Sequence, residues 1–186
     1  EVDFFFPNYP KTDVYWQPRE LDPGNYQVVV VGDGECLTNR ATCLLSRSKA
    51  RVEVEITKSV APAQNPLRHE RGLANLAVEY AGYTQRTSLS LLSGDAPVGL
   101  WNLIQMPHGG ELLVPTYVKT EPKRVFGAVG PGDLAVDDRL IRYRMRAEGE
   151  QKIAVRALAV TGRIGYLVPA RDDRWALIVR NVFVNP

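Results

Sequence analysis

Apolar and polar residues alternate along much of this chain, and the repeat is two residues long. The alternation is clearest in Val52–Ile56, where each glutamate lies between two apolar residues. A period of two places apolar side chains on one face of a β-strand and polar side chains on the other. The 3.6-residue period of an amphipathic helix is scarce. The pattern therefore predicts a chain that consists mostly of strands.

The predicted strands are short and are separated by turns rich in glycine and proline. They are expected at Gln27–Val31, Thr42–Ser46, Val52–Ile56, Leu73–Tyr83, Thr87–Leu92, Gly99–Met106, Glu111–Val114, Leu140–Ala147, Lys152–Leu158, Gly165–Val168 and Trp175–Val184. Only Pro66–Leu76 has the pattern of a short helix, and Gly72 argues against that helix. The stretch Thr120–Asp138, which is rich in proline and glycine, is expected to be a long loop.

Strands that do not alternate with helices indicate antiparallel pairing. The predicted fold class is therefore all-β, an antiparallel β-sandwich (supersandwich-like) with little helix. A length of 186 residues is that of one domain, so residues 1–186 are expected to form a single β-sandwich domain. No apolar run approaches the 18 residues of a membrane-spanning helix.

The net charge is +2, which is too small to indicate a nucleic-acid partner. The charge is unevenly distributed: residues 1–138 hold 13 basic and 17 acidic side chains, whereas residues 139–186 hold 10 and 4. The basic C-terminal quarter is suited to attract an anionic polymer. The alternative is that its arginines pair with carboxylates on neighbouring strands.

The two cysteines are Cys36 and Cys43, and neither belongs to a zinc-binding pattern. Six residues separate them, enough for a turn that places them on adjacent strands. A disulfide and two free buried thiols are both compatible with this spacing.

A candidate ligand-binding segment runs from Gly99 to Gly110. On a strand, Trp101 and Gln105 share one face, and His108 follows beside a turn of two glycines. An indole ring near an amide and an imidazole suits a sugar, because pyranose C–H groups stack on aromatic rings and hydroxyls need donors and acceptors that do not change charge. The alternative is that Trp101 lies in the core and Gln105 bonds to the backbone.

A second candidate is a row of alternating arginines, Arg142, Arg144 and Arg146. Lys152 or Arg156 would extend the row from a neighbouring strand. Such a row could hold uronic acids or sulfates through bidentate contacts. The alternative is a solvated face with cross-strand partners such as Glu53 and Glu55.

Other kinds of chemistry have little support in the sequence. The two histidines, His69 and His108, would suit acid–base work only if a carboxylate lay beside one of them. The sequence contains no G-x-S-x-G, phosphate-binding loop, H-E-x-x-H or GxGxxG motif. The acidic residues Asp133, Asp137 and Asp138 do not have EF-hand spacing. No metal or cofactor is therefore expected.

Six segments together resemble a known family. They are Val78–Thr84 (VEYAGYT), Thr87–Ser90 (TSLS), Gly99–Leu103 (GLWNL), Leu112–Thr116 (LLVPT), Gly149–Ala154 (GEQKIA) and Ala176–Phe183 (ALIVRNVF). In this order they resemble the galactose-mutarotase-like (aldose 1-epimerase-like) β-supersandwich superfamily, and the uncharacterised bacterial members most closely. The resemblance covers about residues 25–184.

The resemblance implies a large antiparallel supersandwich with a concave, sugar-binding sheet. In the epimerases of this superfamily, a histidine acts as general acid and a glutamate as general base when the sugar ring opens. His108 is the weak candidate for the acid. The family's glutamate lies in a later segment, and the chain ends at Asn185–Pro186 where the family would continue.

Three functions are compatible with these observations. The first is a carbohydrate-associated domain that binds a saccharide without turning it over, through Trp101, Gln105, His108, Arg142 and Arg144. The second is an aldose 1-epimerase with His108 or His69 as acid and Glu79 or Glu111 as base. The third is a structural or interaction domain that uses its basic edge to contact a partner chain.

The sequence also carries expectations about processing. The first residues, EVDFFFPNYP, lack the basic and long apolar regions of a signal peptide, and the first residue is not methionine. The chain is therefore expected to be processed or excised from a longer protein, with a periplasmic or secreted location slightly favoured.

Overall fold

The computed structural model describes residues 11, 14–31, 34–73, 77–100 and 102–183. The chain divides into two compact units, residues 1–103 and 104–186. Each unit contains its own antiparallel sheet. The expectation of a single β-sandwich domain over residues 1–186 stays a prediction.

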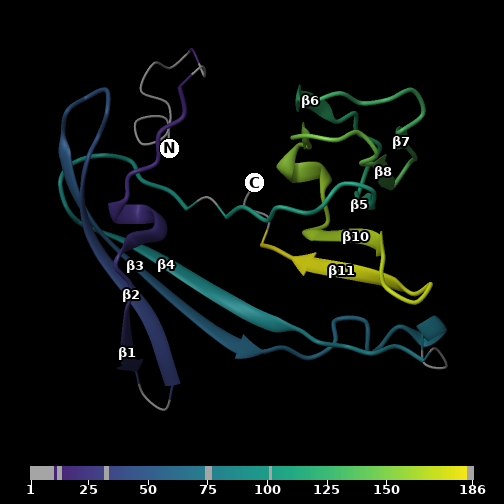
Figure 1. The fold of residues 1–186 in the computed structure, drawn as a ribbon, viewed down its shortest axis with the longest axis horizontal. Coiled ribbons are helices and arrows are strands. Elements are labelled where there is room, and N and C mark those ends of the chain that lie inside the picture. The colour runs from purple at the N-terminus through teal and green to yellow at the C-terminus, as the bar shows by residue number, and fades with distance from the viewer. Residues whose placement is uncertain (1–10, 12–13, 32–33, 74–76, 101, 184–186) are drawn as a thin grey trace. The chain divides into compact units, whose positions relative to one another are not determined.

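The first unit contains a four-stranded antiparallel sheet in which sequence neighbours are also spatial neighbours (Figure 1). Its strands are β1 (Gln27–Val31), β2 (Gly34–Leu44), β3 (Arg51–Pro62) and β4 (Tyr83–Ser93). A helical turn, η1 (Glu20–Gly24), precedes β1, and a single 3-10 turn, η2 (Arg71–Leu73), lies between β3 and β4. The order is that of a simple meander, so each strand pairs with the strand that precedes or follows it in the chain.

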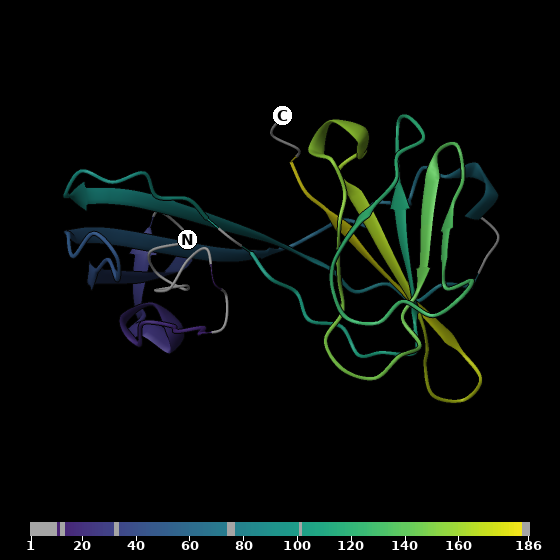
Figure 2. The same cartoon turned by 90° about the horizontal axis from the view of Figure 1, so that it is seen from above.

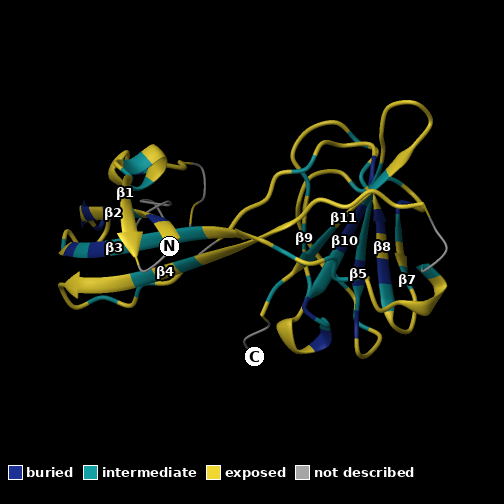
Figure 3. Cartoon of the chain, turned by 90° about the horizontal axis from the view of Figure 1, so that it is seen from below, coloured by how far each residue is buried: buried dark blue, intermediate teal, exposed yellow. Residues whose placement is uncertain are grey.

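The two faces of this sheet differ in character (Figure 3). Register pairs Ala41 with Val54 and Cys43 with Val52, so these side chains share one face, which we call the packed face. They are buried together with Leu45 and contact Leu21 of η1. On the opposite, polar face, Arg40 lies beside Glu53. The alternation of Val52–Ile56 thus produces one packed face and one polar face, as its period of two predicts.

The second unit contains a five-stranded antiparallel sheet in the order β11-β10-β5-β8-β7, and a two-stranded sheet, β6-β9 (Figure 2). The strands are β5 (Glu111–Pro115), β6 (Lys123–Phe126), β7 (Leu134–Val136), β8 (Leu140–Arg144), β9 (Lys152–Ala154), β10 (Arg163–Pro169) and β11 (Trp175–Asn181). A 3-10 turn, η3 (Ala157–Ala159), precedes β10.

Two tyrosines anchor the core of the second unit. Tyr143 and Tyr166 are buried, together with Val114 and Ile141. The Tyr166 hydroxyl accepts a hydrogen bond from the Gly110 backbone N–H at 3.0 Å and donates one to the Pro107 carbonyl. A Cβ at residue 110 would overlap the Tyr166 ring, so only glycine fits there. Burial raises the pKa of the Tyr143 phenol, and the charge of Asp133 adds to that effect.

The predicted fold class is confirmed. The structure is 45% strand and 7% helix, and its antiparallel sheets give an all-β, sandwich-like fold. The predicted strand at Gln27–Val31 has the observed bounds, and those at Thr87–Leu92, Glu111–Val114 and Gly165–Val168 lie inside observed strands. In the part of the chain that the structure describes, no helix is long and apolar enough to cross a membrane.

Several predicted elements are wrong. The described part of Leu73–Tyr83 is not a strand until Tyr83, and the described part of Gly99–Met106 contains no strand. The stretch Thr120–Asp138 is not one long loop, because it contains β6 and β7. Residues 66–73 form turns and η2 instead of an α-helix. An apolar run forms a strand only where the backbone of a neighbouring strand forms hydrogen bonds with it. The periodicity of a sequence does not show whether such a neighbour is present.

The two cysteines lie on one strand rather than on adjacent strands. Both Cys36 and Cys43 belong to β2, both are buried, and neither forms a disulfide. Seven residues along a strand span about 23 Å, and an odd separation places the side chains on opposite faces. A bond between them is therefore geometrically excluded.

We expect the folded protein to contain two free thiols that react slowly with a thiol reagent at pH 8. Burial raises the pKa of the Cys43 thiol, and the Glu20 charge raises it further, so the reactive thiolate is scarce. In an Ellman titration without reductant, the thiols of the native protein should react slowly. In denaturant, the titration should count two reactive thiols per chain. A titre of zero in denaturant before reduction would contradict the assignment.

Candidate functional site

A hollow among the described residues of the first unit has a volume of about 270 Å³. Its lining combines an aromatic ring, a carboxylate, a hydroxyl and a guanidinium over an apolar floor. The lining residues are Trp16, Pro18, Glu20, Thr42, Leu44 and Arg51. We call this the Trp16 hollow.

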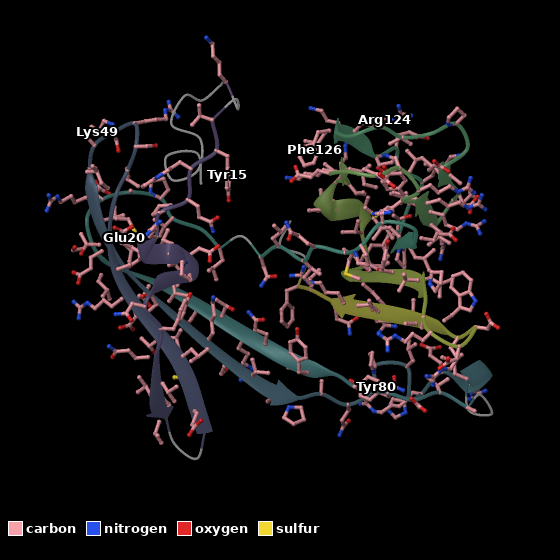
Figure 4. All side chains as sticks on the ribbon, in the orientation of Figure 1. Tyr15, Glu20, Lys49, Tyr80, Arg124 and Phe126 are labelled. Atoms are coloured by element: carbon pink, nitrogen blue, oxygen red, sulfur yellow. The ribbon has the colours of Figure 1, made fainter. Side chains whose placement is uncertain are left out.

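The hollow forms where β2 is not covered by β1. Register pairs β1 only with residues 34–38 of β2, so residues 39–44 have β3 on one side and no strand on the other. The chain segment before β1 occupies this open side, and its turn η1 contacts β2. Glu20 lies in that turn, beside β2 (Figure 4). The hollow therefore lies between the η1 segment and the ends of β2 and β3.

One buried side chain holds the η1 segment against the sheet. Asn39 is 1% exposed, donates a hydrogen bond from Nδ2 to the Glu20 carbonyl at 2.8 Å, and accepts one at Oδ1 from the Asn25 N–H at 3.2 Å. Gly24 has a positive φ of +72°, and a Cβ there would lie 2.8 Å from Asn39 Nδ2. The amide of Asn39 and the glycine thus fix the turn that carries Glu20.

Apolar burial supports the same turn. Pro18 is fully buried, and its carbonyl accepts hydrogen bonds from the N–H groups of Leu21 and Asp22, both at 3.0 Å. Leu21 then packs against the buried cluster of the packed face. Trp16 precedes this anchored proline and keeps 48% of its surface exposed. The ring is therefore presented at the rim of the hollow by a well-held backbone.

The polar groups of the hollow are available to a ligand. Among the described residues, neither Glu20 nor Arg51 forms an ion pair. Thr42 supplies a hydroxyl that both donates and accepts, Glu20 supplies two acceptor oxygens, and Arg51 supplies a planar set of donors. Such a lining can bind a neutral ligand that has several hydroxyl groups. Among its described lining residues, Glu20 is the one carboxyl group and no imidazole is present.

Comparison of the chain with protein-family models, curated proteins and solved structures finds no match. The resemblance to the galactose-mutarotase-like superfamily therefore stays a prediction. The function of the chain is accordingly inferred from the geometry of its described residues.

The first predicted site, in the segment from Gly99 to Gly110, does not lie on a strand in its described part. Trp101 lies outside the described residues. Gln105 and His108 are both exposed and belong to no strand, so the proposed alternation of side chains on one strand face does not apply to them. The backbone of the following Gly109 donates to the Met145 carbonyl. His108 thus lies at a turn that the second unit holds in place.

The structure places Arg142 and Arg144 of the predicted arginine row on β8 and Arg146 beyond the end of that strand, with carboxylates beside them. Arg142 and Arg144 are exposed and line a small hollow of about 70 Å³ together with Glu111 and Asp133. Arg142 lies 3.6 Å from Asp137, and Arg146 lies 3.5 Å from Asp133. The lining of this small hollow contains as many acidic as basic side chains. It therefore does not strongly favour an anionic ligand.

The proposed neighbours of the row are wrong. Lys152 belongs to β9, which pairs with β6 in the other sheet of this unit, and Arg156 precedes η3 outside any strand. Glu53 pairs with Arg40 on β2 at 2.6 Å. The hydrogen bond from Arg40 lowers the pKa of the Glu53 carboxyl. The carboxylates beside the row come instead from Glu111 of β5, which pairs with Arg144, and from Asp133 and Asp137 next to β7, in a segment that the sequence predicts to be a loop.

Among the residues proposed for epimerase chemistry, those of the second unit do not form a linked acid–base pair. His69 and Glu79 belong to the first unit, and His108 and Glu111 belong to the second. Within the described residues, no hydrogen bond or ion pair joins His108 to Glu111. Likewise, no group of three His, Cys, Asp or Glu side chains in the described ranges could hold a metal ion.

The sequence does not single out the residues of the Trp16 hollow. Trp16, Glu20, Thr42 and Arg51 lie in segments with different patterns, and nothing in the spacing connects them. One signal is present: the Trp-Gln-Pro sequence at residues 16–18 places an aromatic ring next to a proline outside any predicted strand. A tryptophan outside the predicted strands is a candidate contact residue, because tryptophan is enriched at binding interfaces, where its ring supplies a large apolar surface.

Proposed function

We propose that this chain is a saccharide-binding protein and that the Trp16 hollow is its binding site. The observation that carries the proposal is the half-exposed Trp16 ring at the rim of a hollow lined by Glu20, Thr42 and Arg51. The apolar face of a pyranose would stack on the indole. Its hydroxyl groups would then donate to Glu20, accept from Arg51, and do either with Thr42.

The dimensions of the hollow support a small sugar. Its volume of about 270 Å³ is near the lower end of small-molecule sites. One or two sugar units are therefore the expected occupants, with longer chains extending into solvent. A shallow site buries little ligand surface, so we expect dissociation constants on the order of 0.1–1 mM.

Titration of the full chain against neutral and uronic-acid-containing mono- and oligosaccharides would test the proposal. We expect saturable heat with at least one glycan, and saturation-transfer NMR should show the sugar C–H protons closest to an aromatic ring. The lack of saturable binding to every neutral and acidic glycan would contradict it. Polarimetry with α-glucose and α-galactose in the same series tests epimerase activity, which the binding proposal does not require.

A further inference from the structure

Strand β1 leaves one edge of the first unit's sheet open. Among the described residues it pairs with β2 alone. Every residue of Gln27–Val31 is exposed, as the yellow β1 arrow shows (Figure 3). Val28, Val30 and Val31 keep 63%, 71% and 64% of their surface exposed. Four consecutive valines therefore lie on an open strand edge in contact with solvent.

An open edge presents unpaired backbone N–H and C=O groups that can pair with another strand. Proteins usually protect such an edge with charge, proline or a bulge. β1 has none of these: it carries no charged residue and no proline, and its five register pairs with β2 are unbroken. The opposite edge strand, β4, differs, because it carries Arg86 and its register with β3 shifts near Ser93. Of the two edge strands of this sheet, β1 is therefore the one without charge, proline or a bulge.

We propose that β1 pairs antiparallel with β1 of a second copy of this chain, so that two four-stranded sheets join into one. A two-fold axis that is perpendicular to the sheet and midway between Val29 of the two copies pairs Val28 with Val30 of the second copy, and Val30 with its Val28. This register pairs all five residues of each strand. A shift of two residues would leave some of them unpaired, and a shift of one residue would place the side chains of one strand on the opposite face. No like charges meet, and each valine opposes an apolar residue except Val31, which opposes Gln27.

The arrangement also continues the packed face across the axis. Val28 pairs with Leu37 in β2, so it lies on the same face as Ala41 and Cys43. A perpendicular two-fold axis keeps that face on the same side in both copies. Val28, Val30 and Leu37 of each copy then lie together on that face, with Glu35 beside Val30 at the margin of the strip. The valine side chains supply the favourable burial and the ladder supplies the register.

The proposed contact between the two β1 strands is small, and its size limits the affinity of the dimer. One five-residue strand pair with its valines is smaller than the interfaces of permanent dimers. We therefore expect a reversible dimer with a dissociation constant on the order of 10–100 µM. Sedimentation velocity of the full chain over a concentration series should show a monomer–dimer equilibrium in that range.

A charge exchange identifies the contacting strand. One double variant carries Val28→Lys and Val30→Lys, and the other carries Val28→Glu and Val30→Glu. In the proposed register residue 28 opposes residue 30 of the second copy, so each variant alone places like charges opposite one another and should dimerise at least tenfold more weakly. An equimolar mixture places Lys opposite Glu and should restore the dimer.

Val60→Lys is the matched control, because Val60 lies on the packed face of β3 with a similar exposure of 62% but away from the β1 edge. It should leave the dimer unchanged. Wild-type chain that stays monomeric at several hundred micromolar would overturn the proposal. So would dimerisation of either charged variant at wild-type strength, or a mixture that fails to dimerise while circular dichroism shows both variants folded.

Discussion

Replacing Trp16 by alanine is expected to weaken saccharide binding about tenfold or more. Trp16 is the one aromatic ring among the described lining residues, and aromatic contacts with their buried area account for roughly 1.5–2 kcal/mol of binding free energy. The side chain is 48% exposed, so the free energy of unfolding should change little. Isothermal titration with the glycan that binds wild-type protein measures the loss.

Trp175→Ala is the matched control for this experiment. Trp175 is a 64% exposed tryptophan on β11 of the second unit and does not line the Trp16 hollow. Its replacement should leave the dissociation constant within about a factor of two of wild type. Equal losses in the two variants, or an unchanged constant for Trp16→Ala, would move the binding site away from the hollow.

Replacing Asn39 by alanine is expected to lower the free energy of unfolding of the first unit by about 2–4 kcal/mol. The variant loses both hydrogen bonds of the buried Asn39 amide, so the Glu20 carbonyl and the Asn25 N–H lose a partly buried partner. Urea unfolding followed by circular dichroism measures the change, and hydrogen exchange at residues 21–25 locates it.

The same variant tests whether the turn positions the site. Because η1 carries Glu20, a loosened turn should weaken glycan binding under conditions where the protein remains folded. Ser88→Ala, at an exposed position of β4, should change the free energy of unfolding by less than about 0.5 kcal/mol and leave binding intact. An Asn39→Ala protein of wild-type stability would show that the amide does not anchor the segment.

Much of the fold could be predicted because the relevant signal is local. Val52–Ile56 and Leu140–Arg144 alternate in the sequence, and in the structure Val52, Val54, Ile141 and Tyr143 are buried while Arg142 and Arg144 are exposed. The alternation records which face each side chain occupies, whatever strand lies next to it. For the same reason the alternation predicts that Arg142 and Arg144 share the exposed face of one strand. It does not predict which carboxylates lie beside them.

Errors arose where a strand depends on its neighbour. Residues 99–106 are as apolar as β5, yet their described part lies outside the sheets, whereas β6 and β7 formed in a segment with abundant glycine and proline. β7 is held by pairing with β8 at Leu134, Ala135 and Val136. A short strand of that kind is stabilised by the ladder and not by its own composition.

The alternating pattern by itself determined the fold class, the faces of the central strands and the presence of an arginine row, because each is a property of residues close together in the chain. The Trp16 hollow was decided by the tertiary structure alone. It requires Trp16 and Glu20 to meet Thr42 and Arg51 beside the uncovered end of β2, and Asn39 holds them there. That meeting depends on how far β2 extends beyond the end of β1, and the sequence pattern predicts only Thr42–Ser46 in that region, whereas β2 runs from Gly34 to Leu44.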